Sequence, residues 1–177
     1  MPTLPLRALP RVFLPGADPT QTIALPPGEI DKFRKTLRLR AGDEIAVLPN
    51  DGSVVRCSFQ MHTAEPIAIE WPLTEPQLEV TLLQALPKGD RVETVVRMGT
   101  ELGVRRFTLF HAARSVARWE AKKLSEKLRR LDVIAREAAE QSFRTRLPEI
   151  AWTDSLKTAL EAYPDALLLS EKEGVTR

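Results

Sequence analysis

The sequence of 177 residues has a single cysteine, Cys57, and only two histidines, His62 and His111. One cysteine excludes an internal disulfide and a multi-cysteine zinc site, and it favours a reducing compartment such as the cytoplasm. The two histidines lie in different predicted parts of the chain, so packing at strand ends is favoured over a metal site. We likewise expect Cys57 to pack within a strand rather than to act as a nucleophile.

Long apolar runs and the common catalytic motifs are also missing. No apolar run approaches the roughly 20 residues that span a bilayer, so we expect no membrane partner. The patterns G-x-G-x-x-G, G-x-x-x-x-G-K-[ST], H-E-x-x-H and G-x-S-x-G do not occur in the sequence. With 43% hydrophobic and 28% charged residues, the chain has enough apolar material for a packed core.

Charge is unevenly distributed, although the formal net charge is only +2. Residues 32–40 hold five basic and no acidic side chains, and residues 105–146 hold 12 basic and 5 acidic side chains. Two such basic zones indicate a polyanion partner, most often a nucleic acid. Solvated helix faces explain the same pattern equally well, so charge alone leaves both alternatives open.

The first part of the chain has short segments with the composition of strands. The predicted elements are strands at 44–48, 53–61 and 64–71 and a helix at 28–38. The cluster Asn50-Asp51-Gly52 predicts a hairpin turn between the first two strands. Pro72 and Pro76 then oppose a continuous helix or central strand. We therefore predict a small β-barrel domain over residues 1–73 and a second domain over residues 74–177.

The second part alternates predicted strands and helices. The predicted elements are strands at 78–86, 106–110 and 166–170, helices at 90–102 and 118–142, and a helix capped at Thr153 or Asp154 that ends near residue 163. Asp90 and Glu93 have the spacing of a capping box, and Gly103 suits the end of the same helix. The order strand, helix, strand predicts a βαβ unit and a parallel sheet, and therefore an α/β fold.

The end of the long predicted helix carries acidic, amide and basic side chains within residues 136–149. Arginine forks suit phosphates, and the pair Glu140-Gln141 can read a base edge. Cations near a helix C-terminus are also favoured by the helix dipole. Both a functional and a structural interpretation of this segment therefore stay open.

Ordered blocks along most of residues 11–170 resemble the RsmE-type small-subunit rRNA methyltransferases, a branch of the SPOUT superfamily. The blocks are RVF at 11–13, LRLRAGDEI at 37–45, QALPKGD at 84–90, TELGV at 100–104, RS at 114–115, AAEQ at 138–141 with Arg144, and LPEI at 147–150. The sequence departs from the family at Met98, where lysine is usual, and at Phe143, where glycine is frequent.

The resemblance implies a PUA-like barrel that helps to bind RNA, followed by a SPOUT α/β domain with a trefoil knot, in a homodimer. It also implies methyl transfer from S-adenosylmethionine to N3 of a uridine in the 16S rRNA of the small ribosomal subunit. The family's later knot and cofactor segments have no counterpart here, so we expect a truncated domain, inactive as it stands and without cofactor-binding residues. A catalytically silent RNA-binding module is the alternative, and an unrelated α/β enzyme with basic surfaces is a third.

The resemblance also implies which residues meet the RNA. The candidates for holding the target RNA are Glu140, Gln141, Arg144 and Arg146. The candidates for contacting backbone phosphates are Arg11, Arg34, Arg38 and Arg40 in the barrel and Arg114, Arg118, Lys122, Arg129 and Arg136 in the α/β domain. We assign no residue as catalytic and none as a metal ligand.

Overall fold

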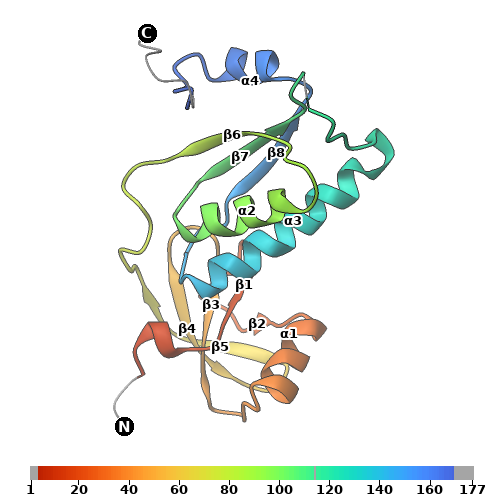
Figure 1. Cartoon of the computed structure of the whole chain (residues 1–177). Helices are drawn as coiled ribbons and strands as arrows, with labels where there is room; N and C mark the ends of the chain where they lie inside the picture. The colour runs from red at the N-terminus through yellow and green to blue at the C-terminus, as the bar shows by residue number, and fades with distance from the viewer. Residues whose placement is uncertain (1–3, 114, 170–177) are drawn as a thin grey trace.

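Two β-sheets organise the chain, which the computed structural model describes over residues 4–113 and 115–169. The first sheet has five strands in the order β1-β3-β4-β5-β2, and the second has three strands in the order β6-β7-β8. Figure 1 shows the first sheet in red to yellow below the second sheet in green and blue. Residues 71–80 connect the last strand of the first sheet to the first strand of the second.

The five-stranded sheet is curled and mainly antiparallel. Its strands are β1 (Arg11–Phe13), β2 (Ile23–Ala24), β3 (Glu44–Leu48), β4 (Val54–Phe59) and β5 (Thr63–Glu70). The predicted hairpin is confirmed, since β3 and β4 pair in antiparallel register around a turn in which Asn50 and Gly52 have positive φ. Among the described strands of this sheet, β1 and β3 form the one parallel pair. The edge strands β1 and β2 do not pair with each other among the described residues, so the PUA-like barrel stays a prediction.

The interior of this sheet is closed by a short helical segment. It comprises α1 (Pro27–Asp31) and the following π-helical turn η2 (Lys32–Thr36), where a helix was expected at 28–38. Phe33 lies on this segment and packs edge-to-face against Phe59 with ring centroids 5.6 Å apart. Cys57 belongs to the same core, and burial raises the pKa of its thiol to about 12. The expectation that Cys57 packs within a strand is therefore confirmed.

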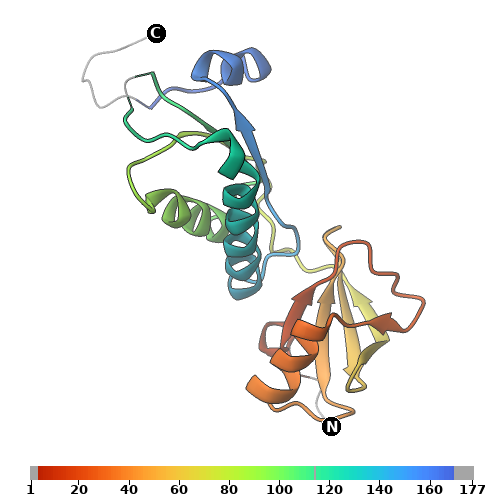
Figure 2. The same cartoon turned by 90° about the vertical axis from the view of Figure 1, so that its right-hand side faces the viewer.

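The second sheet is parallel, as the βαβ pattern predicts. Its strands are β6 (Thr81–Ala85), β7 (Arg106–Phe110) and β8 (Glu149–Thr153), and its helices are α2 (Arg91–Glu101), α3 (Ala121–Gln141) and α4 (Leu156–Ala162). Side chains of α2 and α3 share one core with β7, so both helices cover the same face of the sheet (Figure 2). Gly103 follows α2 with φ +98°, which confirms its predicted role at the helix end.

The predicted capping box at α2 is only half right. Asp90 is the N-cap residue, but its side chain makes no capping hydrogen bond. Glu93 instead reaches the neighbouring helix, where its Oε1 lies 2.7 Å from Nε of Arg130. An ion pair between helices has therefore replaced the expected local contact.

The third strand of this sheet is not where the sequence predicted it. Residues 166–169 form no strand, Leu167, Leu168 and Leu169 are largely exposed, and Ser170 lies outside the described residues. The third strand is instead β8, which pairs with β7 on the side opposite β6 and which was not predicted from the sequence. The last helix is capped by Ser155 rather than by Thr153 or Asp154, because the Ser155 side chain accepts a hydrogen bond from the Thr158 amide.

The C-terminal end of α3 packs against the first sheet. Ala139 and Phe143 share a buried cluster with Leu9, Phe13 and Leu48. Figure 1 shows this end of α3 beside β1. α3 therefore bridges the two sheets, since its C-terminal end packs on the first sheet and Leu131 and Ala135 pack in the core of the second. No helix in the described ranges is both long and apolar enough to cross a membrane.

Candidate nucleic-acid interface

A pocket of about 480 Å³ lies where the end of α3 meets β1 and η2. We call it the junction pocket, and the lining residues that concern its chemistry are Arg7, Arg11, Lys32, Glu140, Gln141 and Phe143. Three cationic side chains and one carboxylate give this lining a positive balance, which suits an anionic ligand. The structure thus brings three predicted RNA residues together in one concave surface, namely Arg11, Glu140 and Gln141.

Glu140 is tied to the first sheet by an ion pair. Its Oε2 lies 2.8 Å from Nζ of Lys32, and its Oε1 accepts a hydrogen bond from the Phe13 amide at 3.4 Å. Burial alone lowers the pKa of Lys32, but the hydrogen bond and charge of Glu140 outweigh it, so the pKa is raised overall. Lys32 is therefore protonated at neutral pH, and the pair fixes the end of α3 onto η2.

The Arg11 guanidinium donates its hydrogen bonds to backbone carbonyls. Its Nη1 donates to the Glu140 carbonyl at 3.2 Å, and Nη2 donates to the carbonyls of Arg7 and Leu9 at 2.5 and 3.2 Å. Burial and the nearby Arg7 charge lower the pKa of Arg11, while Glu140 raises it in part. Because an arginine keeps its proton at neutral pH, Arg11 places a cation at the C-terminal end of α3.

Phe143 explains why this helix ends as it does. The Arg144 amide donates to the Ala139 carbonyl at 2.9 Å, which is the characteristic bond of a Schellman motif with Ser142 as C-cap. Phe143 then occupies the left-handed position with φ +59°, where glycine is favoured. Its ring is 5% exposed and belongs to the cluster joining α3 to the first sheet. Burial of the ring compensates for the unfavourable backbone conformation.

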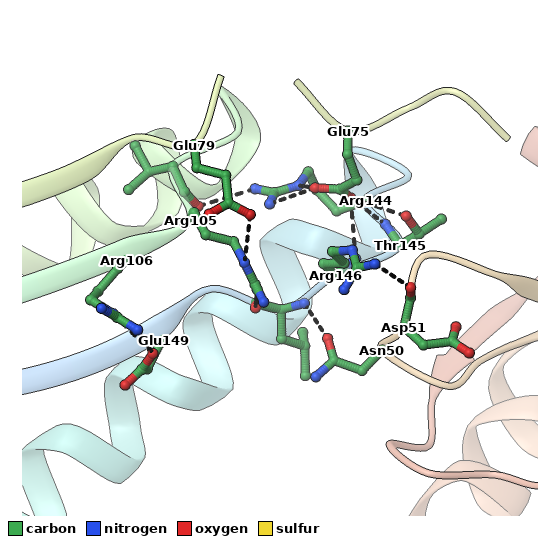
Figure 3. A network of polar contacts seen from close by, with 12 residues as sticks. Asn50, Asp51, Glu75, Glu79, Arg105, Arg106, Arg144, Thr145, Arg146 and Glu149 are labelled. Atoms are coloured by element: carbon green, nitrogen blue, oxygen red, sulfur yellow. Dashed lines mark hydrogen bonds and ion pairs between the residues drawn. The ribbon is translucent and has the colours of Figure 1, made fainter. Parts of the chain in front are cut away.

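Arg144 lies apart from the junction pocket, in a cluster centred on Glu75. Its Nε donates to Oε2 of Glu75 at 2.8 Å, and its Nη1 donates to the carbonyls of Thr100 and Val104 at 2.8 and 3.3 Å. Figure 3 shows this guanidinium directed at the Glu75 carboxylate. The Arg144 side chain is only 3% exposed, so it has a structural role where the sequence led us to expect an RNA contact.

The amides that follow Arg144 complete the Glu75 cluster. Oε1 of Glu75 accepts from the Thr145 and Arg146 amides at 2.7 and 3.1 Å. Burial alone raises the pKa of Glu75, but its hydrogen bonds from Arg144 and the two amides outweigh it and lower the pKa. Glu75 is therefore ionised at neutral pH and fixes the connection between the sheets to the α3–β8 loop.

The same loop also contacts the β3–β4 turn. Oδ1 of Asn50 accepts from the Leu147 amide at 2.6 Å, and Nη2 of Arg146 donates to the Asp51 carbonyl (Figure 3). Arg146 remains partly exposed. Its guanidinium is thus anchored on the first sheet, at a place separate from the junction pocket.

The remaining predicted phosphate contacts include two groups of exposed side chains. Arg34, Arg38 and Arg40 are exposed on and after η2, close in sequence to the pocket residues Lys32 and Leu37. Arg118, Lys122 and Arg129 are exposed at and before the N-terminal half of α3, a helix of about 30 Å. Arg136 instead donates to the Phe13 carbonyl at 2.7 Å, and Arg114 lies outside the described residues.

Three important residues escaped the sequence analysis as individual candidates. Arg7 lies in a proline-rich segment without periodicity, Lys32 was noted only within its basic cluster, and Glu75 was hidden in the connection between the sheets. The basic composition of residues 32–40 was the signal for Lys32. Glu75 has no local signal, because its partners are 69 to 71 residues away in the sequence.

Comparison with known proteins decides the family. Residues 74–176, more than half of the chain, match the family described as RNA methyltransferase domain. The chain belongs to this RNA methyltransferase family. The junction pocket, with the Arg7 and Arg11 cations and the Gln141 amide, therefore belongs to a member of an RNA methyltransferase family.

Relatives and solved structures agree with the family assignment. Ribosomal RNA small subunit methyltransferase E of Bacillus subtilis is 34% identical over 149 residues, which are 81% of this chain and 58% of that protein. The protein of the same name from a Synechocystis strain is 36% identical over 133 residues, which are 73% of this chain and 43% of that protein. The chain therefore spans about half the length of the curated relatives it matches. These matches confirm the resemblance to the RsmE-type methyltransferases.

The fold of this family member also matches solved structures. The structure of ribosomal RNA small subunit methyltransferase E from Neisseria gonorrhoeae, bound to S-adenosyl methionine, is 25% identical with a TM-score of 0.80, covering 96% of this chain and 75% of that one. Lpg2936 from Legionella pneumophila, solved with the same cofactor, is similar in fold at 23% identity and a TM-score of 0.84, covering 96% and 72%. The predicted α/β class is thus confirmed.

Proposed function

We propose that the protein methylates N3 of a uridine in small-subunit (16S) rRNA, with S-adenosylmethionine as methyl donor. The observation that carries this proposal is the 34% identity to the B. subtilis small-subunit methyltransferase across 81% of the chain. The positive lining of the junction pocket independently supports an RNA ligand.

The two sheets support a division of labour between two domains. We assign residues 1–73, with the curled five-stranded sheet, to a PUA-like RNA-binding domain, and residues 74–177, with the parallel sheet, to a SPOUT methyltransferase domain. A cytoplasmic homodimer that acts on the small ribosomal subunit is part of the same proposal. The family match and the named relatives support the ribosomal RNA substrate. The cytoplasmic homodimer rests on the resemblance to the RsmE-type methyltransferases.

Backbone contacts to the RNA are assigned to the exposed arginines. Arg34, Arg38 and Arg40 have exposed side chains close in sequence to the pocket residues Lys32 and Leu37. Arg118 precedes α3, and Lys122 and Arg129 are exposed on its N-terminal half. Each phosphate that an arginine neutralises adds about 0.7 to the slope of log affinity against log salt for single strands. Arg144 is left out of this set, because its donors already have protein partners.

The described residues do not form a site that fits the cofactor. In parallel α/β sheets, ligands bind beyond the carboxyl ends of the strands. At that edge, Nε2 of His111 accepts from the Trp119 amide at 2.9 Å, and Trp152 packs against the rings of both. Within the described ranges, no buried polar side-chain atom without a partner lies there. We therefore assign none of these residues to S-adenosylmethionine.

The chain's own contribution to the reaction is binding and orientation of the RNA. S-adenosylmethionine would supply the electrophilic methyl group, and the described residues would contribute by holding the RNA in a fixed orientation, which lowers the entropic part of the barrier. The N3 proton of the uridine has to be removed for transfer. No described side chain is assigned as its acceptor, since Glu140 is already paired with Lys32.

An RNA-binding module without catalysis is the second candidate. The observation that favours it is the paired state of the residues at the carboxyl edge of the parallel sheet. Under this alternative the basic surfaces bind RNA, but no methyl group is transferred.

Methyl transfer from isotopically labelled S-adenosylmethionine to small ribosomal subunits tests the proposal. The methyltransferase proposal predicts label in the RNA and, after digestion, 3-methyluridine by mass spectrometry. Label in another nucleoside would contradict the N3 assignment. Salt-dependent binding to 16S rRNA without any incorporated label would favour the RNA-binding module, and the absence of both would refute an RNA function. A variant with both Arg38→Gln and Arg40→Gln is expected to bind 16S rRNA more weakly than the unaltered protein.

A further inference from the structure

We propose that the junction pocket receives an unpaired RNA base, which stacks on the guanidinium of Arg11. This inference rests on the proposed function, because it takes RNA to be the ligand. It also gives Arg11 a role different from the phosphate contact expected from the sequence.

The hydrogen bonds of Arg11 argue against a phosphate contact. A guanidinium grips a phosphate with the donors at the edge of its plane. In this structure Nε, Nη1 and Nη2 of Arg11 are all directed at carbonyl oxygens, those of Leu9, Glu140 and Arg7. Most of the edge is therefore occupied, while the hydrogen-bond acceptors themselves are neutral carbonyls that do not neutralise the charge. What the residue still offers to a ligand is the face of its plane.

One side of Arg11 is already supported by an aromatic ring. Its Cζ lies over Phe143, 4.5 Å from the ring centroid, and Phe143 is 5% exposed. The ring is thus covered and cannot itself meet a base. Arg11 is only half-buried and lines the junction pocket. Four hydrogen bonds and a ring beneath it hold the guanidinium as a preformed platform. Arginine planes are known stacking surfaces for unpaired RNA bases.

The other walls of the pocket have the chemistry that a nucleotide needs. The Gln141 amide, which can both donate and accept, is exposed and has no hydrogen-bond partner within 4–113 and 115–169. Arg7 is exposed and forms no ion pair within the same ranges, so it remains available for the adjoining phosphate. Lys32 and Glu140 neutralise each other. The volume of about 480 Å³ lies in the range of small-molecule sites, about 300–1,000 Å³.

Oligonucleotides with and without bases test this proposal without altering the protein. The probes are single-stranded oligoadenylate and an abasic oligomer with the same number of phosphates, and the measurement is the dissociation constant at several salt concentrations. We expect the abasic oligomer to bind about tenfold more weakly, as for one lost stacked base, with the same salt slope. Equal dissociation constants would overturn the proposal.

Variants locate the effect in the pocket. Arg11→Lys keeps the charge but removes the planar face, so we expect it to lose the preference for the base-bearing oligomer. Arg97→Lys is the matched control, because Arg97 is exposed on α2 outside the pocket, and it should keep the preference. A retained preference in folded Arg11→Lys protein would overturn the assignment.

A crosslinking measurement on the unaltered protein covers the case in which Arg11→Lys does not fold. RNA carrying 4-thiouridine should crosslink to peptides that contain Arg11 or Gln141, and crosslinks found only elsewhere would refute the pocket. The proposed function fails separately, since it predicts methyl transfer to small-subunit rRNA. Methyl transfer without any base preference would sink this inference alone.

Discussion

Breaking the Glu75 cluster should lower the free energy of unfolding of the chain. Breaking an exposed ion pair elsewhere should change it much less. The perturbation is Glu75→Gln, which keeps the shape of the side chain and removes its charge. The Arg144 guanidinium then stays buried, 3% exposed, with no carboxylate beside it. Removing one partner of a buried pair is costly because the other charge is left uncompensated.

The magnitude follows from the burial of the two partners. Breaking a fully buried pair costs about 3–5 kcal/mol. The Glu75 side chain is 21% exposed, which puts the expected loss at the lower end, about 3 kcal/mol. For a chain of this size each kcal/mol lowers the melting temperature by about 2–4 °C, so the expected shift is about 6–12 °C.

Urea unfolding monitored by circular dichroism measures this loss. The matched control is Asp31→Asn, which breaks the exposed pair with Lys35, whose side chains are 59% and 73% exposed, and should cost less than about 0.5 kcal/mol. Arg144→Met and the double variant close a thermodynamic cycle. The double variant should lose about 2 kcal/mol less than the sum of the single variants, since both change one interaction.

Two results would refute this reasoning. Glu75→Gln protein that unfolds at the same urea concentration as Asp31→Asn would show that the cluster contributes no stability. Arg144→Met protein that is as stable as the wild type but binds RNA more weakly would restore the RNA contact expected from the sequence.

Three further predictions follow from single features. The pKa of Glu75 is lowered in the folded state. The stability that ionised Glu75 contributes is therefore complete above the unfolded pKa of about 4.3 and is lost as the pH falls through the folded pKa. Acid titration should destabilise the wild type more than Glu75→Gln. Phe143→Gly and Phe143→Ala should both lower the free energy of unfolding measured in urea. The glycine variant should be more stable than the alanine variant by about 1 kcal/mol, because φ at this position is +59° and glycine adopts such a conformation without strain. Replacing Arg38 and Arg40 by glutamine should lower the salt slope of single-stranded RNA binding by about 1.4 in a fluorescence titration, and an unchanged slope would remove both from the interface.

Elements with strong local signals were predicted well. The strand at Arg106–Phe110 was predicted with the correct bounds, and the long helix was predicted at 118–142 where the structure has Ala121–Gln141. The apolar positions of α3 repeat at helical spacing over many turns, and Gly103 marks a helix end by its own conformational freedom. Such signals lie within a few residues of the element they determine.

The exchange of one strand for another shows where local signals fail. A short apolar run such as residues 166–169 is compatible with a strand, but the structure leaves Leu167 and Leu169 exposed and unpaired in any sheet. Residues 149–153 become β8 because their backbone pairs with β7, and that pairing is formed across about forty residues of chain. Which of two short runs completes a sheet depends on that long-range pairing rather than on composition.

The candidate site divides in the same way. Basic zones, the Glu140-Gln141 pair and the ordered family blocks were visible in the sequence. They correctly predicted the RNA methyltransferase family and the α/β part, whereas the barrel stays a prediction. The sequence could not separate Arg11, which lines the junction pocket, from Arg144, which is buried against Glu75. Both are arginines in basic surroundings, and only the tertiary structure decides which side chain has partners and which faces a cavity. Burial and hydrogen bonding are properties of residues far apart in sequence, so they arise only when the two sheets and α3 come together.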